Sequence, residues 1–207
     1  MPLYKSFRFD DTTQILLWDI TESLEDLYQT AISDSSLLRL SAMKSDLHKR
    51  GFLSVRMLLQ HAGYSDHDLF YDEFGKPHLK EGKHISISHS HQCSAVIVSD
   101  KTVGIDLELR RDKIAKIADK FVEPSFVLEK TSPDYINKLT VNWGAKEAIF
   151  KIRNEKGISF KDHIDIKPFE MRSGKTEATL HFDKLQRHFD VYFEEPGNYT
   201  LVYVFEQ

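Results

Sequence analysis

Two acidic residues of this chain are spaced so that both can act on one point. Asp106 and Glu108 lie two residues apart in the apolar run 103–109. In a β-strand, residues two apart point to the same face, so their carboxylates can meet. Carboxylate oxygens are ligands that Mg²⁺ prefers. The spacing therefore predicts a Mg²⁺ site. The alternative left open is the solvated polar face of an amphipathic strand.

A third acidic residue follows in a segment with helical periodicity, 143–153. Its apolar residues recur as one stripe, at Ala145, Ala148, Ile149 and Ile152. Glu147 and Lys151 are one helical turn apart on the face that this stripe leaves free, and Lys146 flanks them. A carboxylate and two ammonium groups are expected there. The alternative is a surface salt bridge, although the neighbouring Trp143 suggests a partly buried floor.

Hydroxyl and imidazole groups end an expected strand at Ser88 and His89, where they can donate hydrogen bonds to a phosphate. The alternative is an ordinary polar loop. His91 completes a His-Ser-His pair, but no further zinc ligands stand nearby in the sequence. Cys93, the single cysteine, precedes an apolar run and is expected to pack in the core.

Five basic residues fall between Arg110 and Lys120, against two acidic ones, so this is the most basic stretch of an acidic chain. It is either a solvated helix face or a docking surface for an acidic partner. Lys49, Arg50 and Arg56 form a second basic group on one face of an expected helix. The glycine-rich loops GxxxxGK[ST] and GxGxxG do not occur in the sequence.

Apolar periodicity and turn residues predict how these groups are positioned. A strand and a following helix open the chain, and Gly63 is placed to end a long second helix. Later strands alternate apolar and polar residues. Each half thus mixes helices with an antiparallel sheet, an α+β chain. The strands are expected near 14–20, 85–88, 94–98, 103–109, 164–166, 178–182, 189–193 and 199–205, and the helices from Thr21 and over 37–62, 114–121 and 143–153.

Size and composition limit the classes of protein. With 207 residues, the chain can form one large domain or two small ones. A net charge of −4 argues against bulk binding to nucleic acid. One cysteine allows no intrachain disulfide, which fits a reducing compartment. The N-terminus lacks the apolar run of a secretory signal, and no run of apolar residues is long enough to span a membrane. We expect a cytoplasmic protein.

Four motifs in order give the chain a family resemblance. They are Gly75-Lys76-Pro77, Ser88-His89-Ser90, Gly104-Ile105-Asp106-Leu107-Glu108, and Trp143-Gly144-Ala145-Lys146-Glu147-Ala148 with Lys151. The set resembles the 4′-phosphopantetheinyl transferases of the surfactin-synthetase type, and the match spans about Lys49 to Ile166. The family commonly has a small hydroxyl residue after the tryptophan, where this chain has Gly144; this departure removes no proposed ligand.

The resemblance implies a fold and a set of binding residues. It implies two similar α/β subdomains with antiparallel sheets, 1–100 and 101–207, related by a pseudo-twofold axis and holding coenzyme A in the cleft between them. Asp106, Glu108 and Glu147 would bind Mg²⁺. The residues that would contact coenzyme A are Ser88 and His89 at a phosphate, Lys76 and Pro77 near the adenine, Lys49, Arg50 and Arg56 towards the 3′-phosphate, and Lys146 and Lys151.

The resemblance also implies a reaction. A serine hydroxyl of an apo acyl or peptidyl carrier protein would attack the β-phosphate of coenzyme A and release 3′,5′-ADP. Glu147, or a metal-bound water beside it, would take the serine proton, and Lys151 would stabilise or protonate the leaving phosphate. The basic segment would dock an acidic carrier, and the chain would act as a monomer. The alternatives are a Mg²⁺-dependent phosphohydrolase and a non-catalytic scaffold that binds carriers.

Overall fold

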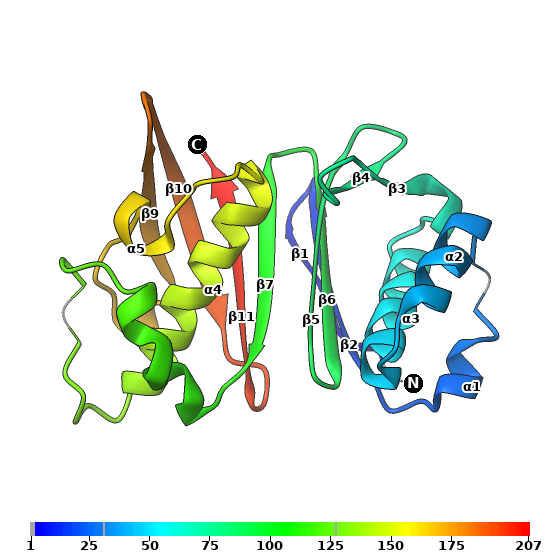
Figure 1. The fold of residues 1–207 in the computed structure, drawn as a ribbon, viewed down its shortest axis with the longest axis horizontal. Helices are drawn as coiled ribbons and strands as arrows, with labels where there is room; N and C mark the ends of the chain where they lie inside the picture. The colour runs from blue at the N-terminus through cyan, green and yellow to red at the C-terminus, as the bar shows by residue number, and fades with distance from the viewer. Residues whose placement is uncertain (1–2, 31, 127) are drawn as a thin grey trace. The chain divides into compact units, whose positions relative to one another are not determined.

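The computed structural model describes residues 3–30, 32–126 and 128–207. The chain forms two compact units, Met1–Lys101 and Thr102–Gln207. Each unit contains an antiparallel sheet with helices against it, so the α+β class expected from the sequence is confirmed (Figure 1). Among the described residues, no helix is long and apolar enough to cross a membrane.

The N-terminal unit has a four-stranded sheet in the order β1-β2-β6-β5. Its long helix packs on one face of that sheet, and the apolar residues between helix and sheet form the core of the unit. A two-stranded hairpin, β3-β4, forms a sheet of its own, and β4 packs beside β5. The elements are β1 Leu3–Asp10, β2 Thr13–Asp19, α1 Leu24–Leu27, α2 Asp34–Ala42, α3 Asp46–His61, η1 Asp66–Asp68, β3 Leu69–Tyr71, β4 Pro77–Leu79, β5 His84–Ser90 and β6 Cys93–Ser99.

The helical region of this unit differs from the sequence prediction. The expected helix over 37–62 is two helices, because α2 ends at Ala42 and Ser45 caps the start of α3 by accepting the His48 N–H. Leu47, an apolar residue of the expected helix, is 40% exposed. The predicted stop at Gly63 is confirmed, since this residue follows α3 with a left-handed φ of +89°.

Two features near the start of the chain were missed or misplaced. Strand β1 was not expected, since its residues alternate between half-buried and exposed positions and its apolar signal is weak. The first helix begins at Leu24, with Ser23 as its N-cap, and not at Thr21. Ser23 and Asp26 form a capping box, in which each side chain satisfies a backbone N–H of the other's turn.

The C-terminal unit has a five-stranded sheet in the order β7-β11-β10-β9-β8. Helix α4 lies along one face of it, mainly over β7 and β11 (Figure 1). The expected strand over 103–109 is confirmed with these limits. The elements are β7 Val103–Leu109, η2 Asp112–Lys120, α4 Tyr135–Arg153, α5 Phe160–His163, β8 Ile164–Ile166, η3 Met171–Ser173, β9 Lys175–Phe182, β10 Leu185–Glu194 and β11 Tyr199–Glu206.

Helix α4 begins two turns before the predicted start but buries the predicted stripe. Ala145, Ala148 and Ile149 are fully buried, and Ile152 is 5% exposed. At Gly104 the strand β7 approaches α4 backbone to backbone: a Cβ there would lie 2.1 Å from the Ala148 carbonyl oxygen. The glycine therefore serves the packing of helix on strand, one of the two uses that a strand glycine suggests.

The two units share a topology. In each, the last strand before the long helix pairs with the second strand of a hairpin that the returning chain forms. The series is β2, α3, β5 and β6 in one unit and β7, α4, β10 and β11 in the other. The expectation of two similar subdomains agrees with this order. The pseudo-twofold axis stays a prediction.

Candidate functional site

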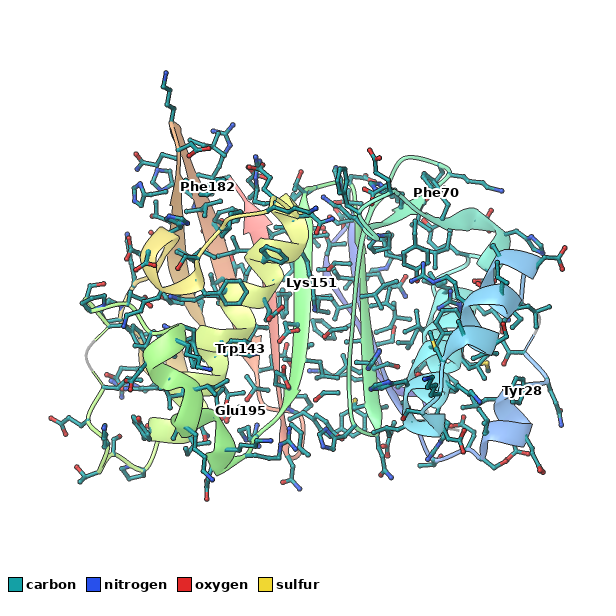
Figure 2. All side chains as sticks on the ribbon, viewed as in Figure 1. Tyr28, Phe70, Trp143, Lys151, Phe182 and Glu195 are labelled. Atoms are coloured by element: carbon teal, nitrogen blue, oxygen red, sulfur yellow. The ribbon has the colours of Figure 1, made fainter. Side chains whose placement is uncertain are left out.

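Asp106 is buried in the C-terminal unit and paired with a cation from the helix. It lies on β7, and its side chain is only 6% exposed. Lys151 Nζ donates to Asp106 Oδ1 over 2.8 Å and to the Ile105 carbonyl oxygen over 2.9 Å. Figure 2 shows Lys151 projecting from α4. A solvated strand face is therefore the wrong reading of Asp106, because α4 covers this residue.

Glu147 joins this pair from the same helix. Burial raises the pKa of Glu147 to about 7; the charge of Asp106 adds to this, Lys151 opposes it, and Glu108 adds a smaller part. Three carboxylates and one ammonium group thus act on one another. Lys151 forms an ion pair with Asp106 of the neighbouring strand, whose side chain is 6% exposed, so a surface salt bridge alone does not describe this site.

Glu108 is held by Trp143. The Trp143 Nε1–H donates to Glu108 Oε1 over 3.2 Å. The indole packs edge-on against Phe121, with ring centroids 5.1 Å apart, and against Phe160 at 5.5 Å. Trp143 is partly buried, as expected of a floor beside the acidic residues. The aromatic contacts fix the indole, and the indole fixes one oxygen of Glu108.

Gly144, where the sequence departs from the family pattern, lies inside α4 and not at its start. A Cβ at this position would lie 2.8 Å from Val202 Cγ2 and 3.4 Å from Asp106 Oδ2. The missing side chain lets α4 approach β11 and leaves room beside the Asp106 carboxylate. The glycine at this position therefore shapes the site.

A pocket of about 220 Å³ opens next to Glu108. Its wall is mainly apolar, and basic residues stand at its rim. It is lined by Glu108, Leu109, Arg111, Lys113, Ile114, Ile117, Thr140 and Trp143. This composition suits a ligand with an apolar body and an anionic end. Sequence patterns do not predict the pocket, because its lining residues, in the stretches 108–117 and 140–143, come together only in the fold.

Within the basic segment, Arg110 has a structural task. Its guanidinium donates to the carbonyl oxygens of Gly197 and Tyr199 and lies 3.4 Å from Glu195 Oε1. These contacts tie the end of β7 to the turn between β10 and β11. The remaining basic residues of the segment are exposed, namely Arg111, Lys113, Lys116 and Lys120.

The structure corrects the prediction for Lys146. The ammonium group does not share a face with Glu147 and Lys151: the residue is fully buried. Nζ lies 2.5 Å from Glu123 Oε2, and it also donates to backbone carbonyl oxygens of three segments. Burial lowers the pKa of Lys146, and Glu123 opposes that shift. A contact between Lys146 and coenzyme A is excluded in this arrangement.

Sequence reasoning missed Glu123 altogether. It lies in an irregular segment, 23 residues before Lys146, and its other oxygen accepts the Ile166 N–H over 2.6 Å. No local pattern in the sequence marks such a long-range partner. Buried charges are usually paired, so the burial of Lys146 is the signal that points to a nearby carboxylate.

In the N-terminal unit, Ser88 and His89 end strand β5 as predicted. Ser88 is 7% exposed, whereas His89 is exposed. The His89 ring lies over Gly51 of α3: a Cβ there would be 3.2 Å from His89 Cγ. The ring of His48 is 6.2 Å from it, centroid to centroid. The His89 imidazole therefore lies beside α3, near the ring of His48.

The three basic residues of α3 have different environments in the structure. Arg56 is 2% exposed and forms an ion pair of 2.9 Å with Asp66, so the predicted contact with coenzyme A is wrong for this residue. Arg50 donates to the Ile20 carbonyl oxygen over 2.7 Å. Lys49 lies 3.6 Å from Asp46. Lys49 and Arg50 are half-buried and remain candidates for an anion.

Lys76 and Pro77 belong to the β3-β4 hairpin. Gly75 adopts a left-handed φ of +82°, and the Lys76 N–H donates to Asp72 Oδ1 over 2.9 Å. His78 stacks on Phe70 with ring centroids 5.3 Å apart. This aromatic pair was not singled out from the sequence. It forms across paired strands, and only the hairpin register reveals it.

The acidic side chains of the C-terminal unit are of the chemical type that binds a hard cation. Asp106, Glu108 and Glu147 offer carboxylate oxygens whose charges already act on one another. In the described ranges, however, no three His, Cys, Asp or Glu side chains are grouped closely enough to hold a metal as they stand. A cation would therefore have to compete with Lys151 for Asp106.

The C-terminal unit also carries a family signature. The sequence profile of the 4′-phosphopantetheinyl transferase superfamily (ACPS) matches residues 102–204, which is almost all of this unit. The chain belongs to the 4′-phosphopantetheinyl transferase superfamily. The acidic residues and Lys151 described above all lie inside the matched range. The family resemblance seen in the four motifs is thereby confirmed.

A relative within this superfamily is the 4′-phosphopantetheinyl transferase gsp of Aneurinibacillus migulanus. It is 25% identical over 127 residues, which cover 60% of this chain and 52% of the relative. The match thus spans about half the length of that protein.

Proposed function

We propose that this protein transfers the 4′-phosphopantetheine group from coenzyme A to a serine of an apo acyl or peptidyl carrier protein and releases 3′,5′-ADP. The observation that carries the proposal is the cluster of three carboxylates and Lys151 inside the range that matches the superfamily. The name of the similar gsp protein supports the same class of reaction.

In this reaction, the carrier serine oxygen forms a bond to the β-phosphorus, and the bond from that phosphorus to the bridging oxygen breaks. Glu147, or a metal-bound water beside it, would accept the serine proton, since the base must lie within hydrogen-bond reach of that proton. In the metal-free protein, burial raises the pKa of Glu147 to about 7. Lys151 supplies a positive charge for the leaving phosphate. Its Nζ is held at 2.8 Å from Asp106.

Asp106, Glu108 and Glu147 are the residues that would hold Mg²⁺. A bound Mg²⁺ supplies positive charge to phosphate oxygens, which is the main need of phosphoryl-type transfer. Coenzyme A would contact Ser88, His89, Lys49, Arg50, Lys76 and Pro77, as the family motifs imply. Arg56 and Lys146 are left out of this set because both are buried in ion pairs.

Intact-protein mass spectrometry tests the proposal. Several apo carrier proteins are incubated with coenzyme A, Mg²⁺ and this protein, and we expect one of them to gain roughly 340 Da, the mass of phosphopantetheine. Chelation of Mg²⁺ and replacement of the carrier's acceptor serine by alanine should each abolish the gain. Release of phosphate or nucleotide without a modified carrier would instead favour a hydrolase, and no turnover at all would favour a scaffold.

A further inference from the structure

We propose that Lys146 and Glu123 form a positioning pair that sets the place of Glu108 through Trp143. Neither residue would touch a substrate. The inference deepens the proposed transferase function and rests on it. It assigns Lys146 a task different from binding coenzyme A, and it gives a role to Glu123, which no motif includes.

The pair is among the most enclosed charged groups that the structure describes. The side chains of Lys146 and Glu123 are 0% and 1% exposed, and 2.5 Å separates Nζ from Oε2. Buried ion pairs of this kind are often no more stabilising than an apolar pair of the same volume. Stability alone is therefore a weak reason for placing these charges here, and their contacts indicate a more specific one.

The contacts of Lys146 converge on the two residues that hold the indole. Nζ donates to the Phe121 carbonyl oxygen over 2.7 Å and to the Phe160 carbonyl oxygen over 2.8 Å. The rings of these same two residues pack against Trp143. Trp143 in turn donates to Glu108. One ammonium group thus fixes the backbones of the two aromatic residues that flank the indole bound to Glu108.

Glu123 and Lys146 also bind the backbone of strand β8. Its Oε1 accepts the Ile166 N–H over 2.6 Å, and Nζ of Lys146 also donates to the Ile164 carbonyl oxygen over 2.7 Å. Strand β8 and the segment that carries Phe121 are therefore locked to helix α4 at one point. The orientation of the indole depends on both.

The geometry also argues against direct contact with substrate. An ammonium group has three protons, and four acceptors lie within 2.8 Å of Nζ. Reaching a phosphate would require Lys146 to leave all of them and to leave Glu123 buried without its counter-charge. That cost is of the kind that makes breaking a buried pair strongly destabilising.

The experiment compares Glu123→Gln with a matched control, Asp66→Asn. Each change turns the carboxylate of a buried ion pair into an amide, one in each unit. The amide nitrogen is a donor where an acceptor is needed, so both variants should melt at a lower temperature. We expect only Glu123→Gln to lower kcat for carrier modification, by about 10- to 100-fold, with the KM for coenzyme A unchanged.

Trp143→Phe should show the same loss of kcat, because it keeps the ring packing and removes the donor to Glu108. Lys146→Met is the more destabilising variant, because it leaves Glu123 buried without its counter-charge. Its kinetics are measured at a temperature at which the variant is folded. A rise in the KM for coenzyme A in Lys146→Met, with normal kinetics in Glu123→Gln, would overturn the proposal in favour of a direct phosphate contact.

A spectroscopic signal tests the pair without any assay of transfer. The chain has two tryptophans, so a Trp18→Phe background isolates Trp143. We expect Glu123→Gln to change the near-UV circular dichroism and emission of Trp143, and Asp66→Asn to leave them unchanged. An unchanged signal in Glu123→Gln overturns the positioning role. Because this readout needs no carrier, it separates failure of the pair from failure of the proposed function, which the wild-type carrier assay decides.

Discussion

Lys151 of helix α4 reaches across to strand β7 and places its ammonium nitrogen 2.8 Å from Asp106 Oδ1. The carboxylate is almost fully buried, whereas the lysine side chain is 30% exposed. One member of the pair comes from each of the two elements that carry the acidic cluster. The distance between them therefore depends on how closely the helix packs on the strand.

Asp106→Ala should reduce the rate of carrier modification at saturating Mg²⁺ by about 100-fold or more. The change removes a proposed metal ligand and leaves Lys151 without this partner. The measurement is the initial rate of phosphopantetheine transfer by mass spectrometry. Glu177→Gln, an exposed carboxylate on β9, is the control and should retain the wild-type rate. An unchanged rate in Asp106→Ala would show that the metal-ligand assignment is wrong.

Glu147 should make the metal-free protein less stable as the pH rises towards neutrality. Its pKa is about 7 in the folded state and 4.5 in the unfolded reference, so between these values the folded state holds a proton that the unfolded state lacks. The stability contribution is present below about pH 4.5 and is lost as the pH rises through about 7, by at most about 3 kcal/mol.

Urea denaturation in the presence of a chelator measures this dependence. Glu147→Gln cannot titrate, so its unfolding free energy should fall less across the same pH window. Glu177→Gln is the comparison, because a hydrogen bond from Lys167 lowers the pKa of Glu177 and places its titration below the window. Equal slopes for wild type and Glu147→Gln would contradict the prediction.

Gly104→Ala should destabilise the C-terminal unit and impair transfer. The added methyl group would lie 2.1 Å from the Ala148 carbonyl oxygen, so α4 must move away from β7. We expect a loss of about 3 kcal/mol or more in unfolding free energy. Gly63→Ala meets no atom within 4 Å but has a φ of +89°, and it should cost about 1 kcal/mol. Similar losses in the two variants, measured by chemical denaturation, would refute the role of close approach.

The charge reversals Lys113→Glu and Lys116→Glu, made together, should raise the KM for the carrier and spare coenzyme A binding. Both lysines are exposed on η2, and Lys113 also borders the pocket beside Glu108. Carriers of this class are expected to be acidic, so the reversal turns attraction into repulsion. The control pair Lys175→Glu and Lys184→Glu changes the net charge equally at exposed positions of other elements. A carrier KM that stays constant would retire this docking surface.

The sequence by itself determined the elements that carry the acidic cluster. Alternation along 103–109 and the stripe of small and branched residues after Trp143 are local patterns. Each places its apolar residues on one face of a strand or a helix, and that face becomes buried. The strand carrying Asp106 and the stripe of α4 followed from them directly. The four motifs in their order indicated the family, because short sequence patterns can be recognised without knowing which contacts their residues make.

Only the tertiary structure decided which charged residues face inward. Arg56 and Lys146 follow the same spacing as exposed basic residues, yet each is buried against a carboxylate from a distant segment, Asp66 and Glu123. Helical periodicity says on which face a residue lies but not how wide the covered face is. That width depends on what the rest of the chain packs against it, so long-range counter-charges, and the pocket beside Glu108, became visible only in the folded protein.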